Sequence, residues 1–276
     1  MATLYVSDLD GTLLLPDGTL GARTVAVVNA LIAGGGLFTY ATARGYESSS
    51  RVTDRLRLEL PVITYGGAVL ADPGTGAPSR VARVPEEAVA AVLRATEGPG
   101  PVQPILFVNH GGRDRVCWLP GYSTPSVESY LGRRAGDPRL LPLRGWPEID
   151  PGQVFSLAVL GPKEQLARLS DTLAEPLGAC HVTVSEEIYA PGEYWLEVGS
   201  LDGTKAAALE AVVSAVAADR LVCFGDNMND LPMFAMADES LAVANATDEV
   251  QRGATGVIGP NTAEGVAEWL SAHALP

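Results

Sequence analysis

The sequence is poor in the features that mark several broad classes of protein. It has three cysteines, which are far apart and form no C-x-x-C pair: Cys117, Cys180 and Cys223. This spacing argues against a disulfide framework and favours three buried thiols in a reducing compartment. No apolar run approaches the roughly 20 residues of a membrane span. No basic region or cleavage site precedes the first apolar run, so we expect a cytoplasmic protein with no membrane partner.

Positive charge is also scarce. The net charge is −14, and lysines and arginines form no cluster. A chain without a basic face is a poor partner for nucleic acid, so we expect no nucleic-acid binding. An anionic substrate would need cations placed locally at its site. Apolar residues make up 47% of the chain, which is enough for a sizeable core.

Short apolar runs typical of strands alternate with amphipathic segments of helical spacing in two parts of the chain. The runs predict strands at residues 4–7, 37–42, 61–67, 220–226, 240–244 and 256–259. Helices are predicted at 22–35, after Arg44, and at 204–218, 231–237 and 263–274. This alternation indicates an α/β fold in which helices flank a parallel sheet on both faces.

The middle of the chain has a different pattern. Residues 85–96 predict a helix, and residues 104–119 predict a hairpin that turns at 109–115. Strands and helices mixed in this way indicate an α+β module inserted into the α/β core, entered through the linker 72–79. We expect domain limits of 1–80 and 191–276 for the core and 81–190 for the inserted module.

Polar residues follow several of the predicted core strands. Asp8 and Asp10 come after the first strand, Thr42 after the second and Asp226 after the strand near residue 220. Open parallel sheets bind ligands at the carboxyl ends of their strands, so these side chains are expected in one crevice. Lys205 stands at the start of a predicted helix, where main-chain N–H groups favour an anion.

The residue types indicate phosphoryl chemistry. Carboxylate oxygens suit a hard cation such as Mg²⁺, which keeps coordination positions for phosphate. Lys205 would offset charge on the phosphoryl oxygens. One carboxylate can attack phosphorus to give an aspartyl-phosphate, while its neighbour transfers the proton.

Four motifs in this order resemble those of the haloacid dehalogenase-like (HAD) phosphohydrolases. They are "DLDGT" at 8–12, Thr42 in "ATAR", Lys205 in "DGTKAAAL" and "GDNMNDLPM" at 225–233. The last motif and the place of the inserted module are similar to those of the Cof-type subfamily, whose members are sugar-phosphatase-like. The resemblance covers about 1–78 and 191–276, and it implies a HAD-like Rossmannoid core with an inserted α/β cap domain.

The resemblance implies four catalytic residues. Asp8 would be the nucleophile and a Mg²⁺ ligand. Asp10 would protonate the leaving alcohol and then activate water, with its main-chain carbonyl on the metal. Thr42 would donate a hydrogen bond to a phosphoryl oxygen, and Lys205 would pair with the phosphoryl group and Asp8.

Further roles are implied for residues beside these four. Asp226 would ligate Mg²⁺ directly, and Asp230 would act through a metal-bound water. Asn229 would orient Lys205 or the phosphate. From the residues alone, Asp230 is also compatible with a helix cap and Asn229 with a turn. The resemblance implies three more substrate-binding positions: Leu9, Ala43 and Arg44. Ala43 would act through its main-chain N–H.

The sequence departs from the family pattern at a few positions. The family commonly has Gly where this chain has Ala43 and Ala206, and Asn where it has Gly66. The last difference removes an amide that would contact the leaving group. In the inserted module, some polar and aromatic residues are compatible either with a polyol pocket or with ordinary surface and core: Arg113, Arg115, Trp118, Tyr122, Glu187 and Tyr189.

These observations predict a Mg²⁺-dependent phosphomonoesterase acting on a small phosphorylated metabolite such as a sugar or polyol phosphate. An acid two positions after the nucleophile indicates phosphoryl transfer, because a halide leaving group needs no proton. Two alternatives are a phosphotransferase or phosphomutase with the same intermediate, and a non-catalytic sugar-phosphate sensor. We expect a monomer or a homodimer.

Overall fold

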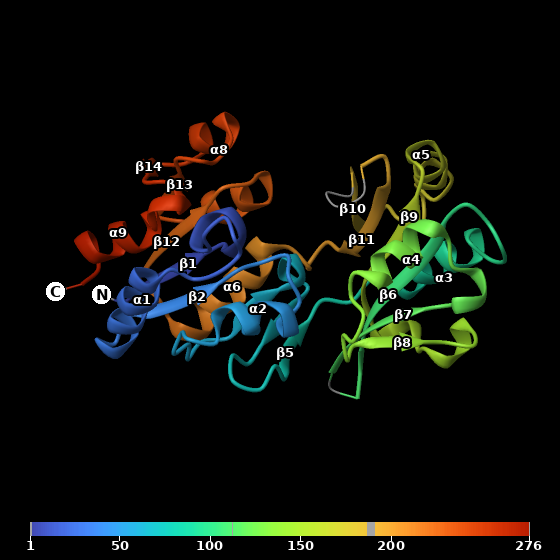
Figure 1. Cartoon of the computed structure of the whole chain (residues 1–276), viewed down its shortest axis with the longest axis horizontal. Helices are drawn as coiled ribbons and strands as arrows, with labels where there is room; N and C mark the ends of the chain where they lie inside the picture. Colours follow the sequence, from blue (N-terminus) through green and yellow to red (C-terminus); the bar gives the residue numbers. More distant parts are fainter. Residues whose placement is uncertain (1, 112, 187–190, 276) are drawn as a thin grey trace. The chain divides into compact units, whose positions relative to one another are not determined.

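The computed structural model describes residues 2–111, 113–186 and 191–275, which divide into two compact units (Figure 1). Unit 1 comprises residues 1–80 and 204–276, and unit 2 comprises residues 81–203. The sequence predicted that the inserted module ends at residue 190, whereas unit 2 ends at residue 203. The difference arises because Tyr194–Ser200 (β11) pairs with strands of unit 2, so the chain returns to unit 1 only at Thr204.

Unit 1 is built on a five-stranded parallel sheet in the order β14-β13-β12-β1-β2. Its strands are β1 (Thr3–Ser7), β2 (Leu37–Tyr40), β12 (Arg220–Gly225), β13 (Glu239–Val243) and β14 (Gly256–Ile258). A second sheet of three strands contains β3 (Val62–Thr64), β4 (Val69–Ala71) and β5 (Pro78–Val81). A parallel bridge between Ala41 and Ile63 connects the two sheets.

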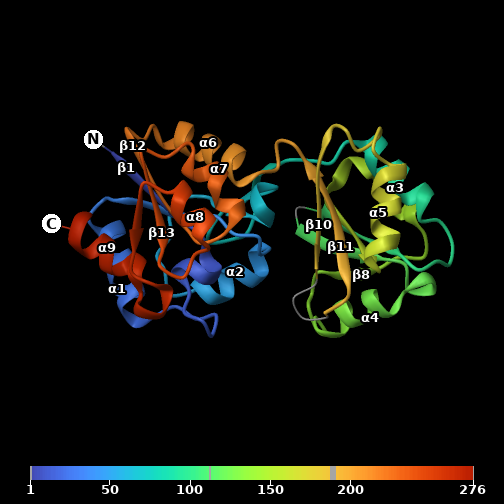
Figure 2. The same ribbon diagram turned by 90° about the horizontal axis from the view of Figure 1, so that it is seen from above.

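Helices of unit 1 cover both faces of the parallel sheet (Figure 2). They are α1 (Ala22–Ala33), α2 (Tyr46–Thr53), α6 (Lys205–Val216), α7 (Leu231–Phe234), α8 (Asp248–Gly253) and α9 (Gly265–His273). α1 packs against α9 and α6 against α7. The central strands are almost wholly buried: Leu4, Val6, Val222 and Phe224 are inaccessible to solvent, whereas Val257 of the edge strand β14 is exposed. Burial on both faces is the reason that the strands are continuous apolar runs in the sequence. The predicted α/β class is confirmed.

Unit 2 contains a six-stranded sheet in the order β10-β11-β9-β6-β7-β8. Its strands are β6 (Gln103–His110), β7 (Arg113–Trp118), β8 (Leu140–Pro142), β9 (Val154–Gly161), β10 (Cys180–Glu186) and β11 (Tyr194–Ser200). Its helices are α3 (Glu86–Ala95), α4 (Pro125–Gly132) and α5 (Lys163–Thr172). The neighbours β6 and β7 are antiparallel, as the hairpin prediction requires. Apolar side chains pack on both faces of the sheet, one cluster with α3 and α5 and another with α4.

The three cysteines are free and buried, which confirms the prediction for them. None of the helices in the described ranges combines the length and apolar character that a membrane span requires.

Candidate active site

The first part of the site is the turn that follows β1. The N–H of Asp8 donates to the carbonyl of Phe224 at 3.0 Å, so Asp8 is the last residue held by the sheet. The chain then bends through a tight turn, η1 (Leu9–Leu13), closed by the N–H of Leu14 on the carbonyl of Leu9 at 2.8 Å. This bend directs Asp8 into a buried position at the edge of the sheet and leaves Asp10 at the surface.

Gly11 makes the turn possible. Its φ is +80°, a conformation that side chains disfavour, and a Cβ there would overlap the carboxylate of Asp226. Asp226 follows β12, and its Oδ1 accepts a hydrogen bond from the hydroxyl of Thr12 at 2.9 Å. The turn after β1 and the end of β12 are therefore in direct contact through a glycine and a threonine of one motif.

Lys205 contributes a buried cation. As the first residue of α6, it follows Thr204, whose hydroxyl accepts from the N–H of Ala207. Its Nζ lies 2.5 Å from Asp8 Oδ1 and 2.7 Å from Asp230 Oδ1. The side chains of all three residues are at least 91% buried, since their exposed fractions are 2%, 9% and 0%. The lysine is thus shared by two carboxylates in the interior.

Asp230 organises this corner of the site. Its Oδ1 accepts a hydrogen bond from Lys205 Nζ, and its Oδ2 accepts hydrogen bonds from the main-chain N–H groups of Asp226 and Asn227 at 3.0 and 3.1 Å. It therefore links the lysine to the chain segment that carries Asp226. Gly67, the last residue of η2 (Tyr65–Gly67), permits α6 to approach, because a Cβ there would overlap the main chain of Thr204.

The charges in this cluster do not balance. Burial raises the pKa of Asp8 to about 8, with the carboxylates of Asp230 and Asp226 acting in the same direction and Lys205 opposing them. Burial also raises the pKa of Asp226. Burial by itself would lower the pKa of Lys205, but Asp8 and Asp230 outweigh it, so this pKa is raised. When all three carboxyl groups are ionised, one ammonium group opposes three negative charges, which leaves excess negative charge for a cation to neutralise.

The same carboxylates fit a metal ion. Asp8, Asp226 and Asp230 each offer an oxygen, and these oxygens lie within 4.8 Å of one another. An all-oxygen, anionic donor set suits Mg²⁺ or Ca²⁺ and is a poor match for soft metals. Since both oxygens of Asp230 already accept hydrogen bonds, Asp8 and Asp226 are better placed for direct ligation.

Asp10 is held apart from this buried cluster by Arg44. The guanidinium donates to both carboxylate oxygens, with Nε 2.7 Å from Oδ2 and a terminal nitrogen 2.6 Å from Oδ1. The main-chain N–H of Arg44 donates to the hydroxyl of Thr42 at 3.1 Å. Because the Asp10 side chain is 53% exposed, it remains accessible to a substrate. The two aspartates of the motif thus occupy different environments.

The remaining predicted residues are less directly connected to the cluster. Thr42 is buried, and its N–H donates to the carbonyl of Ile63 at 2.9 Å. Leu9 is fully buried, while Ala43 and Asn229 are exposed. Asn229 was predicted to orient Lys205 or the phosphate. The neighbouring residue, Asp230, accepts a hydrogen bond from Lys205. Sequence reasoning assigned no role to Thr12, although it belongs to the quoted motif.

In unit 2, the residues compatible with either a polyol pocket or ordinary surface and core have varied surroundings. Arg115 donates to the carbonyl of Pro138 at 2.7 Å. Trp118 packs at the edge of the apolar cluster beside α4, and Tyr122 is 42% exposed. Arg113 is exposed. Glu187 and Tyr189 lie outside the described residues.

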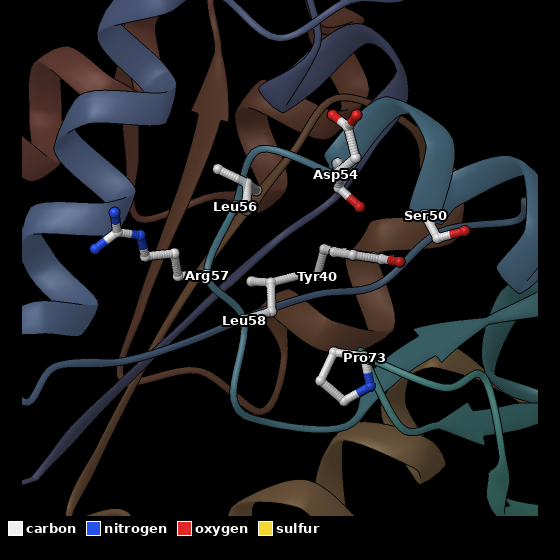
Figure 3. A pocket seen from close by; sticks show the side chains of 9 residues that line it. Tyr40, Ser50, Asp54, Leu56, Arg57, Leu58 and Pro73 are labelled. Atoms are coloured by element: carbon white, nitrogen blue, oxygen red, sulfur yellow. The ribbon is translucent and has the colours of Figure 1, made fainter.

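A separate pocket of about 250 Å³ lies in unit 1, beside Tyr40 and Pro73. Figure 3 shows that its charged residues, Asp54 and Arg57, extend away from the ring of Tyr40 in different directions. None of the predicted site residues lines this pocket. The aspartate–lysine cluster is therefore the candidate active site.

Comparison with known proteins gives one family. A model of the haloacid dehalogenase-like hydrolases matches residues 5–270. An HMP-PP phosphatase of Serratia proteamaculans is 26% identical, over 91% of this chain and 87% of its own length. The 5-amino-6-(5-phospho-D-ribitylamino)uracil phosphatase of Bacillus subtilis is 24% identical, over 98% and 97%.

The fold also matches solved structures over nearly the whole chain. A Thermotoga maritima protein superimposes with a TM-score of 0.80 at 22% identity, covering 99% of this chain and 97% of that one. At this identity the likeness concerns the fold.

Proposed function

This chain belongs to the haloacid dehalogenase-like hydrolases, in the Cof-type subfamily of phosphatases, and we propose that it hydrolyses a sugar or polyol phosphate through an aspartyl-phosphate on Asp8. One observation carries the proposal. Asp8 is buried between Lys205 and two further carboxylates, while Asp10, two residues later, is exposed beside Arg44. We assign the attack to the buried carboxylate beside Lys205 and the proton transfer to the accessible one.

In the first step, a carboxylate oxygen of Asp8 attacks phosphorus and the bond from phosphorus to the leaving oxygen breaks. The proton that the leaving alkoxide requires comes from Asp10. In the second step, water attacks the phosphorus of the aspartyl-phosphate, Asp10 takes its proton, and phosphate leaves with Asp8 restored. Lys205, 2.5 Å from Asp8, holds the nucleophile in place and offsets charge on the phosphoryl oxygens.

We propose that Asp8, Asp226 and the main-chain carbonyl of Asp10 hold Mg²⁺, with Asp230 acting through a bound water. When bound, the ion neutralises the carboxylates and the phosphoryl group. The hydroxyl of Thr42 and the main-chain N–H groups of Leu9 and Ala43 are proposed donors to the phosphoryl oxygens.

One relative supports the proposed substrate class. The Bacillus subtilis relative is named for a compound that carries a phosphate ester on its ribityl chain, which is a polyol phosphate. We propose a substrate of this kind, with Arg44 and Asn229 near its bound end. We further propose a cytoplasmic monomer or homodimer that binds no nucleic acid, in keeping with its three buried thiols and its net charge of −14.

The test is a panel of phosphate esters compared by kcat/KM, with release of inorganic phosphate as the readout. Sugar and polyol phosphates are expected to give the highest values. Transfer of the phosphoryl group to a sugar hydroxyl without release of phosphate would indicate a phosphotransferase or mutase. Binding of these esters without turnover would indicate a sensor.

Mg²⁺ is expected to bind more tightly as the pH rises toward 8. The pKa of Asp8 is raised to about 8 in the metal-free site, so below that pH the ion must displace a proton. Calorimetric titration at pH 6, 7 and 8 measures the affinity and the protons released. Chelation with EDTA is expected to abolish phosphate release, and added Mg²⁺ to restore it. An affinity that does not change with pH would show that Asp8 is not a ligand.

Replacement of Asp10 by Asn is expected to have an effect that depends on the leaving group. For an alkyl phosphate, loss of the proton donor should lower kcat/KM by about 10²- to 10⁴-fold. For p-nitrophenyl phosphate, whose leaving group needs no proton, the first step should be much less affected. Because Asp10 also activates the water, a burst of p-nitrophenolate should precede slow turnover. Equal losses for both esters, without a burst, would contradict the proposed role.

A further inference from the structure

Two asparagines from the C-terminal part of unit 1 hold the turn η1 from outside. Asn245, which follows β13, donates from Nδ2 to the carbonyl of Gly11 at 2.7 Å. Its Oδ1 accepts the main-chain N–H of Asn261 at 2.9 Å. Asn261 in turn donates from Nδ2 to the carbonyl of Leu14 at 2.9 Å. This pair, the asparagine clamp, therefore binds carbonyls within η1 and just after it.

The turn needs such support because it is irregular. Asp10 and Gly11 both leave the helical conformation inside it, with ψ of 123° at Asp10 and φ of +80° at Gly11. Their carbonyls are therefore not aligned as they would be in a helix. The clamp supplies donors to this segment from residues more than 230 positions away in the sequence.

The held turn carries the reacting groups. Asp8 immediately precedes it, Asp10 lies within it, and Thr12 bonds Asp226 from its far side. The Gly11 carbonyl belongs to the peptide group between Gly11 and Thr12. A shift of this carbonyl would loosen the contact between Thr12 and Asp226 and displace the neighbouring Asp10. Displacements of about 1 Å at a reacting group can cost about 10²-fold in rate.

We propose that Asn245 and Asn261 are positioning residues that set the spacing between the Asp8–Asp10 turn and Asp226, and thereby Mg²⁺ affinity and turnover. They act through the main chain of η1 and contact neither substrate nor metal. The inference rests on the proposed function, since it concerns the same site.

The chain offers a matched control. Asn29, on α1, makes the same pair of bonds: its Nδ2 donates to the carbonyl of Arg55 at 2.9 Å, and its Oδ1 accepts the N–H of Arg57 at 2.8 Å. This asparagine also joins separate segments of unit 1, and neither segment carries a predicted site residue. Replacement by Ala removes an equivalent pair of bonds at each site.

The experiment compares Asn245→Ala, Asn29→Ala and the wild type as full-length proteins. Calorimetry with Mg²⁺ gives the dissociation constant, steady-state kinetics gives kcat and KM, and urea unfolding gives stability. Asn245→Ala is expected to weaken Mg²⁺ binding and lower kcat by about 10- to 100-fold, the range for residues that orient metal ligands. Asn29→Ala should leave the Mg²⁺ dissociation constant and kcat within about two-fold of wild type, and its urea midpoint should be similar to that of Asn245→Ala. Equal behaviour of the two variants would overturn the proposal.

A double-mutant cycle tests whether the clamp acts as a unit. The losses in kcat for Asn245→Ala and Asn261→Ser should not add in the double variant, because each replacement releases the same turn. Additive losses would contradict a shared mechanism. If Asn261→Ser does not fold, Asn245→Ala alone still decides the question, because its side chain is exposed. A wild type that neither binds Mg²⁺ nor releases phosphate would instead refute the proposed function.

Discussion

Replacement of Asp8 by Asn is expected to lower kcat for every phosphate ester by about 10⁴-fold or more, the scale on which enzymes lose a nucleophile. The amide keeps the shape of the side chain but cannot form the aspartyl-phosphate. Lys205 retains its bond to Asp230, so the cluster stays assembled. Rapid quenching with a ³²P-labelled ester should trap phosphoprotein in the wild type and none in the variant. Activity within about 100-fold of wild type would rule out Asp8 as the nucleophile.

The same variant should not be less stable than the wild type when Mg²⁺ is absent. The pKa of Asp8 rises from its ordinary 3.8 to about 8 on folding, so the folded chain binds more protons than the unfolded chain between these values. Stability of the metal-free wild type should therefore fall as the pH rises through this range. Asp8→Asn removes the contribution of Asp8 to this dependence and leaves the smaller one of Asp226, whose pKa burial also raises. Urea unfolding at pH 5 and pH 8 with EDTA checks the difference, and an unchanged pH slope would contradict the assignment.

Replacement of Lys205 by Met is expected to damage both stability and activity. Removal of one partner from a buried ion pair costs about 3–5 kcal/mol, because the remaining charge is left uncompensated. Here two carboxylates, Asp8 and Asp230, lose their ammonium partner in a site where Lys205 is 3% exposed. The loss of a cation facing the phosphoryl group should also lower kcat/KM by about 10²- to 10³-fold. Urea unfolding and steady-state kinetics measure the two effects.

Lys163 is the matched control for this prediction. It is likewise the first residue of a helix, α5, but it is exposed, and its ammonium lies 5.4 Å from the ring of Tyr194. Lys163→Met should change stability by less than about 1 kcal/mol and leave kcat unchanged. Adding Asp8→Asn to Lys205→Met should recover part of the lost stability, since one buried carboxylate is removed. A Lys205→Met protein as stable as the control would show that the buried pairs are not required.

The local pattern of the sequence was sufficient to predict the core fold. Strands buried on both faces must be apolar throughout, and amphipathic helices must alternate with them, so the parallel sheet is visible in the chain. No strand was predicted at β11. Its pattern alternates, with Leu196 and Val198 buried and Glu197 exposed, and this pattern does not show which sheet it joins. Pairing with β9 and β10 places this strand in unit 2.

The sequence by itself determined which groups are candidates for the site, because the motif aspartates stand directly after strands whose carboxyl ends meet at one edge. It predicted that Asp8, Asp226 and Lys205 would come together, since helix starts and strand ends are local features. Only the tertiary structure decided how those groups are held. Asp230 accepts a hydrogen bond from Lys205, Arg44 donates to Asp10, and Asn245 donates to the Gly11 carbonyl, all through contacts between distant segments. Such hydrogen bonds depend on distances of a few ångströms between packed elements, and no local pattern of residues specifies them.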